Sequence, residues 1–197
     1  KLRHTDVSEP DDLEAVDAPD YFNGKSSYAV KATRYAGGYC GLMDVGSAAS
    51  VGEGLKILGG SINVANLLGA LPVVATTVEH SNVYGAAGGF AVLADGTNDQ
   101  GATGYAGGFA GKVSGAHVQD SNCYNFSHVI GQVAAGGYAG EIEPGDAADV
   151  LGDTNLAGNV VNADNLLSLV QAFVPSIRNS ETTSVPCGGV VRAQAAT

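Results

Sequence analysis

A short glycine-rich pattern recurs along this chain and constrains its fold more than any other feature. In each copy a Gly-Gly pair is followed by an aromatic or aliphatic residue. A unit this short cannot bury its own apolar face, so its recurrence predicts a stack of similar layers. The five copies are YAGGYCG at 35–41, AAGGFAV at 86–92, YAGGFAG at 105–111, AAGGYAG at 134–140 and PCGGVVR at 186–192.

A longer duplication contains these short copies. At an offset of 99 residues, GYCGLMDVGSAASV (38–51) aligns without a gap to GYAGEIEPGDAADV (137–150). The alignment continues with SINVANLL (61–68) over VVNADNLL (160–167). The chain therefore repeats a unit made of one layer, an apolar insertion and a second layer.

The domain organisation follows from this duplication and from the uneven charge. We predict one domain over 25–197, with the duplicated unit at 35–92 and 134–192. Residues 1–20 hold two basic and seven acidic residues, so we interpret 1–24 as an acidic flexible leader. The alternative is a short first strand or helix packed on the end of the domain.

The segments beside the glycine pairs have the alternation of strands. Polar and apolar residues alternate in AVKATRYAGGYCG (29–41), and glycine permits the tight corners between short strands. We predict a mainly β fold, a right-handed parallel β-helix (solenoid) of about five coils. The glycines expected at corners or crowded inward positions are Gly37, Gly38, Gly88, Gly89, Gly107, Gly108, Gly136, Gly137, Gly188 and Gly189. The residues after them predict an aromatic ladder of Tyr39, Phe90, Phe109 and Tyr138.

Two insertions have a helical pattern instead. In 162–177 the apolar residues from Leu166 to Ile177 recur on one face of a helix, and Pro175 fits its end. The matching stretch at 63–74 holds a similar leucine cluster. We predict short α-helical insertions near 61–74 and 162–175, packed on the solenoid. The alternative is a pair of helices that binds a partner.

Composition and motifs exclude several functions. The net charge of −11, with nine Lys and Arg, argues against nucleic acid as a partner. An apolar run long enough to span a membrane does not occur, so we expect no membrane insertion. The sequence holds no phosphate-binding glycine loop, zinc-type histidine spacing or nucleophile elbow. We therefore predict that the protein is not an enzyme.

We expect no cofactor, and one acidic cluster gives the metal alternative. Glu143, Asp146 and Asp149 could supply carboxylate oxygens to a structural calcium ion. The plainer interpretation is a solvated turn. The duplicated unit has Ser47 and Ser50 in place of the two aspartates.

The cysteines and lysines leave two covalent alternatives open. Cys40, Cys123 and Cys187 lie far apart, and an odd number rules out a complete disulfide framework within the chain. We favour buried free thiols, with a bridge between adjacent coils as the alternative. A lysine (Lys25, Lys31, Lys56 or Lys112) joined to an Asn or Asp by an isopeptide bond is a further alternative.

The recurring [YA]-A-G-G-[FY]-[AC]-G cores, over about residues 28–192, resemble the GLUG-type and related Gly-Gly-rich β-solenoid repeats of bacterial surface proteins. Such repeats are common in adhesins of Gram-positive gut bacteria. The resemblance implies an extracellular protein attached to the bacterial cell wall through the rest of its parent protein. It carries over no catalytic residues. The chain departs from the family in its long insertions and in having no sortase signal.

Two functions remain as expectations. The first is a non-catalytic structural or binding module of a large surface adhesin, presenting a solenoid face to a host extracellular protein or glycan. The second is a carbohydrate-active β-helix enzyme, a polysaccharide lyase or a glycoside hydrolase. An exposed row of Asp, Arg and Lys on three consecutive coils would favour the enzyme.

Overall fold

The computed structural model describes residues 2–3, 7–8, 30–44, 76–85, 88–98, 101–145, 173–186 and 188–194. This described part is mainly β and contains no helix. All strand pairs within it are parallel, apart from the small hairpin of β9 (Thr97–Asn98) and β10 (Gly101–Ala102). The predicted mainly β class with parallel strands is confirmed.

The chain follows one path three times, and each pass forms a layer. The first layer is β3 (Val30–Ala32), β4 (Tyr35–Gly37), β5 (Cys40–Asp44), β6 (Thr77–Glu79) and β7 (Val83–Tyr84). The middle layer is β8 (Phe90–Ala94), β11 (Tyr105–Gly107), β12 (Ala110–Ser114), β13 (His117–Gln119) and the start of β14 (Cys123–Gly131). The third layer is the rest of β14 with β15 (Ala134–Gly136), β16 (Ala139–Glu143), β17 (Ser176–Arg178) and β18 (Thr182–Ser184).

Partial passes lie beyond both outer layers. On one side, β1 (Leu2–Arg3) and β2 (Val7–Ser8) pair with β6 and β7 of the first layer. On the other side, β19 (Val190–Ala193) pairs with β14 and begins a fourth layer. The four described residues of the expected leader are thus strands in the sheets, and the rest of 1–24 lies outside the described residues.

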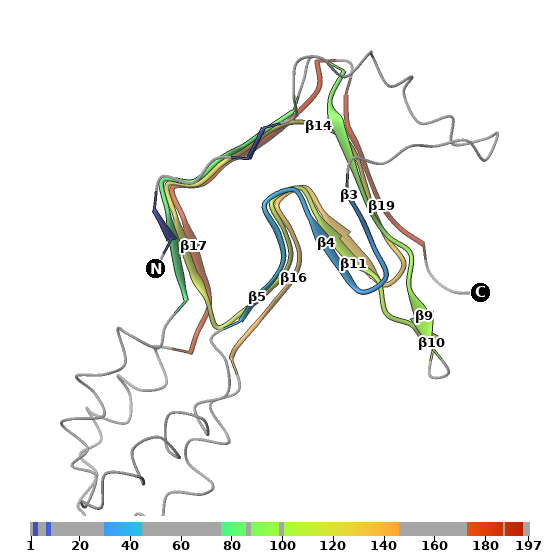
Figure 1. The fold of residues 1–197 in the computed structure, drawn as a ribbon, viewed down its shortest axis with the longest axis horizontal. Coiled ribbons are helices and arrows are strands. Elements are labelled where there is room, and N and C mark those ends of the chain that lie inside the picture. The colour runs from blue at the N-terminus through green and yellow to red at the C-terminus, as the bar shows by residue number, and fades with distance from the viewer. Residues whose placement is uncertain are drawn as a thin grey trace, which may run out of the picture.

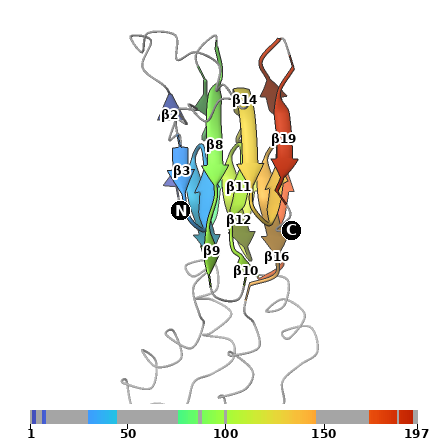
Figure 2. The same ribbon diagram turned by 90° about the vertical axis from the view of Figure 1, so that its right-hand side faces the viewer.

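Viewed along the stack, the strands draw two nested bends (Figure 1). The outer bend runs from β17 across the top to β14 and β19, and the inner bend is formed by β4 and β5 with the strands stacked on them. Figure 2 shows β3, β8, β14 and β19 side by side in one sheet. Apolar side chains of both bends form one core cluster, with Phe109, Val113, Val92 and Val129 fully buried.

Register explains why small residues dominate the inner bend. Three rungs cross β4, β11 and β15: Tyr35–Tyr105–Ala134, Ala36–Ala106–Ala135 and Gly37–Gly107–Gly136. Neighbouring strands lie about 4.8 Å apart, so alanine and glycine can stack on their own kind without a clash. The residues that the repeats have in common are therefore residues that stack directly on one another.

The five glycine pairs are not equivalent, which corrects the sequence interpretation. The pairs at Gly37, Gly107 and Gly136 stack at the inner bend. The pairs at Gly88 and Gly188 instead precede β8 and β19, which lie on opposite sides of β14. These two pairs belong to a different ladder, so successive glycine pairs do not mark successive coils.

The predicted helices fall mostly outside the described residues. This holds for 61–74 and for 162–172, whereas 173–175 form a turn rather than a helix. Ile177, the last apolar residue of the helical pattern, lies in β17 and is in register with Val118 of β13. The helical pattern of apolar residues in the sequence therefore continues beyond any helix, because a strand begins directly after Pro175.

Candidate functional site

Three stacked residues with a left-handed backbone form the outer corner between β6 and β7 and its equivalents. They are His80, Asp120 and Asn179, with φ angles of 50°, 50° and 48°. Few side chains adopt this region, and Asn and Asp are among those that tolerate it. Each is followed by a serine. The corner is thus repeated residue by residue in all three layers.

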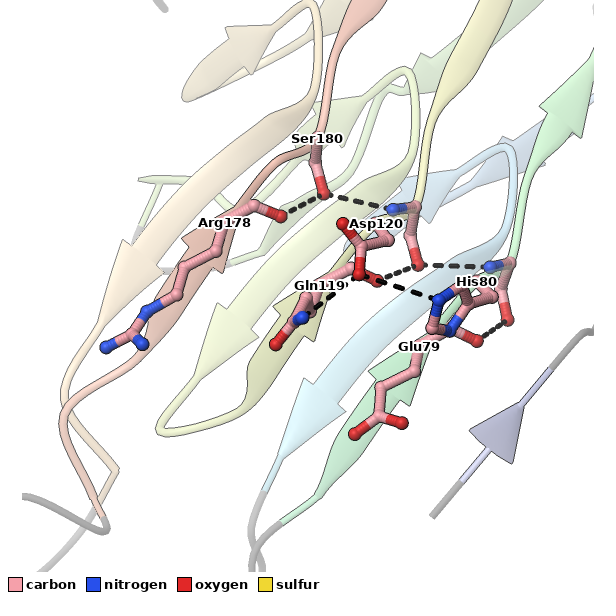
Figure 3. A network of polar contacts seen from close by, with 8 residues as sticks. Glu79, His80, Gln119, Asp120, Arg178 and Ser180 are labelled. Atoms are coloured by element: carbon pink, nitrogen blue, oxygen red, sulfur yellow. Dashed lines mark hydrogen bonds and ion pairs between the residues drawn. The ribbon is translucent and has the colours of Figure 1, made fainter.

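The serines form a hydrogen-bonded ladder across the layers (Figure 3). The N–H of Ser81 donates to Ser121 Oγ at 3.1 Å, and the N–H of Ser121 donates to Ser180 Oγ at 3.1 Å. Each hydroxyl in turn donates to the carbonyl two residues earlier, on Glu79, Gln119 and Arg178. Ser81 and Ser121 are fully buried, so this ladder satisfies backbone donors that water cannot reach.

An outward-facing surface lies directly beside this ladder. Asn82 Oδ1 accepts the N–H of Asn122 at 3.1 Å, and Asn122 Oδ1 accepts the N–H of Glu181 at 2.9 Å. Two residues after the asparagines, the rings of Tyr84 and Tyr124 stack with centroids 5.3 Å apart. We call these five residues the Asn–Tyr surface. It is the one candidate binding site that combines stacked aromatic rings with polar side chains on the outer bend among the described residues.

Two features of the Asn–Tyr surface suit contact with a ligand. Tyr84 is 42% exposed, although a tyrosine ring is largely apolar. Burial raises the pKa of the Tyr124 hydroxyl, and a hydrogen bond to the Glu181 carboxylate raises it further. Tyr124 therefore stays neutral at physiological pH, and the surface offers ring faces, amides and one carboxylate.

A second polar cluster lies on the inner bend around Lys112. Its Nζ is 2.9 Å from Glu141 Oε2 and 2.7 Å from Glu143 Oε1, both in the third layer. The same ammonium lies over the rings of Tyr35 and Tyr105, 5.7 and 5.9 Å from their centroids. We call these five residues the lysine cluster. It joins all three layers by charge and cation–π contacts.

The electrostatics of the lysine cluster indicate a structural role. Burial lowers the pKa of Lys112, but the hydrogen bonds to Glu143 and Glu141 raise it more, so that it lies above its usual value. Its side chain is only 14% exposed. A lysine that holds its proton this firmly is a poor nucleophile or base at neutral pH.

The glycine pairs at the inner bend are crowded in two ways. A Cβ on Gly107 would meet the carbonyl oxygen of Ala110, three residues later in the same turn. A Cβ on Gly108 would meet the carbonyl oxygen of Gly137 in the next layer. At Gly88 and Gly188, by contrast, a Cβ would meet no described atom within 4 Å, although Gly188 has a positive φ angle. The second glycines of these pairs are crowded, because a Cβ on Gly89 would meet Val185 and one on Gly189 would meet Phe126.

The aromatic residues after these pairs stack in the core. Phe109 lies 4.8 Å from Tyr39 on one side and 4.8 Å from Tyr138 on the other, measured between ring centroids. Phe90 does not belong to this ladder, which corrects the four-residue prediction. It is in register with Phe126 instead, because the glycine pair before it belongs to the other ladder.

The calcium candidates are not brought together among the described residues. The Glu143 carboxylate binds Lys112, while Asp146 and Asp149 lie outside the described part. Within that part, no group of three or more His, Cys, Asp and Glu residues could hold a metal ion. The calcium site remains an untested expectation.

The cysteines agree in part with the expectation of buried free thiols. Cys40 and Cys123 are free, but only Cys123 is fully buried, while Cys40 is half-buried. Burial raises the pKa of both thiols to about 11. They stand on different rungs, Cys40 beside Ala110 and Cys123 beside Val83. Cys187 lies outside the described residues.

Sequence reasoning missed the serine corner and the Asn–Tyr surface. A signal was present, because HSNVY at 80–84 recurs as DSNCY at 120–124. The third copy, NSETT at 179–183, keeps only the serine of this pattern and has an asparagine at its first position, where the other copies have His80 and Asp120. Its spacing from the second copy also differs, since an insertion precedes it.

Comparison of the chain with protein-family models, with curated proteins and with solved structures gives no match. Among the described residues, the structure has no helix with the length and apolarity that crossing a bilayer requires. The function is therefore inferred from the geometry of the layers and of their outer surface.

Proposed function

We propose that the chain is a non-catalytic structural and binding module of a large bacterial surface adhesin, which presents one solenoid face to a host glycan or extracellular protein. The observation that carries this proposal is the register of the layers. The same residue types stack at the inner bend, in the aromatic core and at the serine corner. Such repetition is typical of solenoids, which offer long surfaces for binding.

The fold proposed with this function is a right-handed parallel β-helix whose layers are its coils. In this proposal, the three complete layers are three of about five coils, and the partial passes of β1–β2 and β19 belong to the other two. The two insertions would be short helices beside the stack. The module would lie outside the cell and reach the cell wall through the rest of its parent protein.

The Asn–Tyr surface is the binding face that we propose. Apolar faces of sugar rings pack well on exposed tyrosine rings, and sugar hydroxyls bond to amides and carboxylates. Tyr84 and Tyr124 supply two parallel rings from adjacent layers, with Asn82, Asn122 and Glu181 beside them. The surface therefore suits a short stretch of polysaccharide that crosses the layers.

The non-catalytic part of the proposal is supported by the state of the charged groups. The carboxylates that approach the half-buried Lys112 are ion-paired with it. On the outer bend, Glu79, Gln119 and Arg178 stack in register. This row holds one acidic, one neutral and one basic residue, so it does not repeat an acid and a base in each layer. The polysaccharide lyase or glycoside hydrolase remains the alternative outcome of the test.

The test is a glycan array together with purified extracellular matrix proteins, probed with the chain and three variants. Tyr84→Ala and Tyr124→Ala should each reduce binding about tenfold or more, as expected for central aromatic contacts. Tyr35→Ala, which removes an inner-bend tyrosine, is the matched control and should retain binding. Release of new sugar ends from a bound polysaccharide would contradict the non-catalytic proposal. Equal loss in all three variants would contradict the binding face.

A further inference from the structure

The backbone hydrogen bonds at the inner bend run in one direction, from each layer to the next. In the third layer this leaves two donors without an acceptor among the described residues. The N–H of Tyr39 donates to the carbonyl of Phe109, and the N–H of Phe109 donates to the carbonyl of Tyr138. The equivalent N–H of Tyr138 has no acceptor among the described residues. The same holds for Gly137, the counterpart of Gly38 and Gly108. These donors point out of the stack on the side of the third layer.

Apolar side chains are exposed on the same side. Ile142 is 54% exposed, whereas Met43 and Val113 on the same rung are buried. Val190 and Val191 of β19 are each 43% exposed. An open sheet edge that combines unpaired donors with apolar side chains is a template for another strand.

The fourth layer has already begun on this edge. β19 lies on β14 as β8 lies on β3, in parallel register. In the duplicated sequence, the glycine pair before β19 also matches the pair before β8. The strand that follows β8 on this path is β11 of the middle layer. The duplication thus indicates that a layer like the middle one fits over β15 and β16.

Charge identifies the same occupant. In the middle layer, Lys112 lies between Leu42 on one side and Glu141 on the other. A fourth layer like the middle one would place a lysine on the open side of Glu141 and Glu143. A layer like the first would instead place the counterpart of Asp44 over Glu143, with two like charges in register.

A second copy of this chain does not satisfy the edge. Its β1 and β2 precede its first layer by one pass, so they would occupy the positions over β17 and β18. Its β4 and β5 would then stand one layer too far from β15 and β16. One layer would be missing over the N–H groups of Gly137 and Tyr138, which have no acceptor among the described residues.

We propose that the edge formed by β15, β16, β17 and β18 is a docking surface for one further parallel layer with the pattern of the middle layer. This occupant is a segment of another repeat unit that carries Gly-Gly, an aromatic residue and a lysine in the positions of Gly107, Gly108, Phe109 and Lys112. It adds by backbone hydrogen bonds, by stacking on Tyr138 and by pairing its lysine with Glu141.

The experiment inserts a second copy of residues 95–131 directly after Ala193. Ala193 and Ala94 are both in register with Gly131, so the insert follows β19 as residues 95–131 follow β8. Amide hydrogen exchange is then measured by NMR at Tyr138, with Phe109 as the internal reference. The inserted layer should slow exchange at the Tyr138 N–H about tenfold or more, because that group gains an acceptor. Exchange at Phe109 should stay slow in both proteins.

Two variants of the inserted copy define the occupant. Lys112→Glu within the insert should remove most of the protection at Tyr138, because it sets a third carboxylate beside Glu141 and Glu143. Gly107→Val within the insert should also remove it, since the turn cannot form. Unchanged exchange at Tyr138 with the unaltered insert overturns the docking surface. Equal protection by the Lys112→Glu insert overturns the assignment of a lysine-bearing layer.

Discussion

The hydroxyl of Ser180 accepts the backbone N–H of Ser121 at 3.1 Å, one layer away along the stack. Ser121 does the same for Ser81 in the layer before it. A serine at this corner therefore replaces the carbonyl acceptor that a regular sheet would supply. The layers are held in register by side chains as well as by the backbone.

Removal of the middle hydroxyl should destabilise the stack. Ser121→Ala leaves the N–H of Ser81 without its acceptor in a fully buried site. The free energy of unfolding should fall by about 1–3 kcal/mol, the cost of an unsatisfied buried group. Urea denaturation measures this change. Ser184→Ala is the control, because the Ser184 hydroxyl bonds only to the adjacent carbonyl of Val185 among the described residues, and an equal loss there would contradict the role of the ladder.

The first glycines of the two kinds of pair should respond differently to a methyl group. Gly107→Ala forces a Cβ onto the carbonyl oxygen of Ala110, whereas Gly88→Ala adds one where no described atom lies within 4 Å. We expect Gly107→Ala to cost more than about 2 kcal/mol and Gly88→Ala less than about 0.5 kcal/mol. Thermal unfolding of the two variants measures both. Similar losses would mean that the pairs are equivalent after all.

The raised pKa values of the two free thiols predict a loss of stability at alkaline pH. Burial raises the pKa of Cys40 and Cys123 from 9.0 to about 11, so the folded state keeps protons that the unfolded state has lost. Stability should therefore fall as the pH rises from 9 to 11. Thermal unfolding across this range measures the slope. The double variant Cys40→Ala, Cys123→Ala should flatten it between pH 9 and 10, and an unaltered slope would contradict buried, protonated thiols.

The lysine cluster predicts a coupling between layers. Lys112→Met leaves Glu141 and Glu143 together without their cation and should cost about 1–3 kcal/mol, between the values for exposed and buried pairs. The same change should cost much less in a chain that already carries Glu141→Gln and Glu143→Gln. A double-mutant cycle from urea denaturation measures the difference. Equal costs in both backgrounds would show that the ion pairs contribute nothing.

The raised pKa of Lys112 sets the pH range of this contribution. The ammonium is stabilised in the folded state, so its contribution is complete below the ordinary lysine pKa of about 10.4 and is lost as the pH rises further. The cost of Lys112→Met should therefore be constant between pH 6 and 9. A cost that disappears within that range would contradict the assigned protonation.

Much of the fold follows from local features of the sequence. The alternation in 29–41 and the repeated glycine corners predict short parallel strands, because period-two patterns and tight turns are fixed by nearby residues. The stacking of Tyr39, Phe109 and Tyr138 follows from the same repeat. These features do not depend on distant parts of the chain.

The errors arise where the same local pattern occurs in different surroundings. The pair at Gly88 resembles the pair at Gly107, but only the second lies in a turn whose own carbonyl crowds it. The apolar spacing up to Ile177 fits a helix, yet pairing with Val118 makes that residue part of a strand. Tertiary contacts override local periodicity there, and one sequence cannot show them.

The Asn–Tyr surface was hidden for a related reason. Its residues repeat at an offset of 40 between the first two layers but not between the second and third, because an insertion changes the spacing. The asparagine of the third layer is replaced by Glu181, which keeps only the backbone donor. A search for one fixed period therefore does not find it.

Three equivalent layers stack in register, and the hydrogen bonds between them run in one direction. The sharpest test of this arrangement is amide exchange at Tyr39, Phe109 and Tyr138, measured by NMR in the unmodified chain at low concentration. The N–H groups of Tyr39 and Phe109 donate to the following layer, whereas that of Tyr138 has no acceptor among the described residues. The stack predicts slow exchange at the first two and exchange about tenfold or more faster at Tyr138. Equal exchange at all three positions would contradict it.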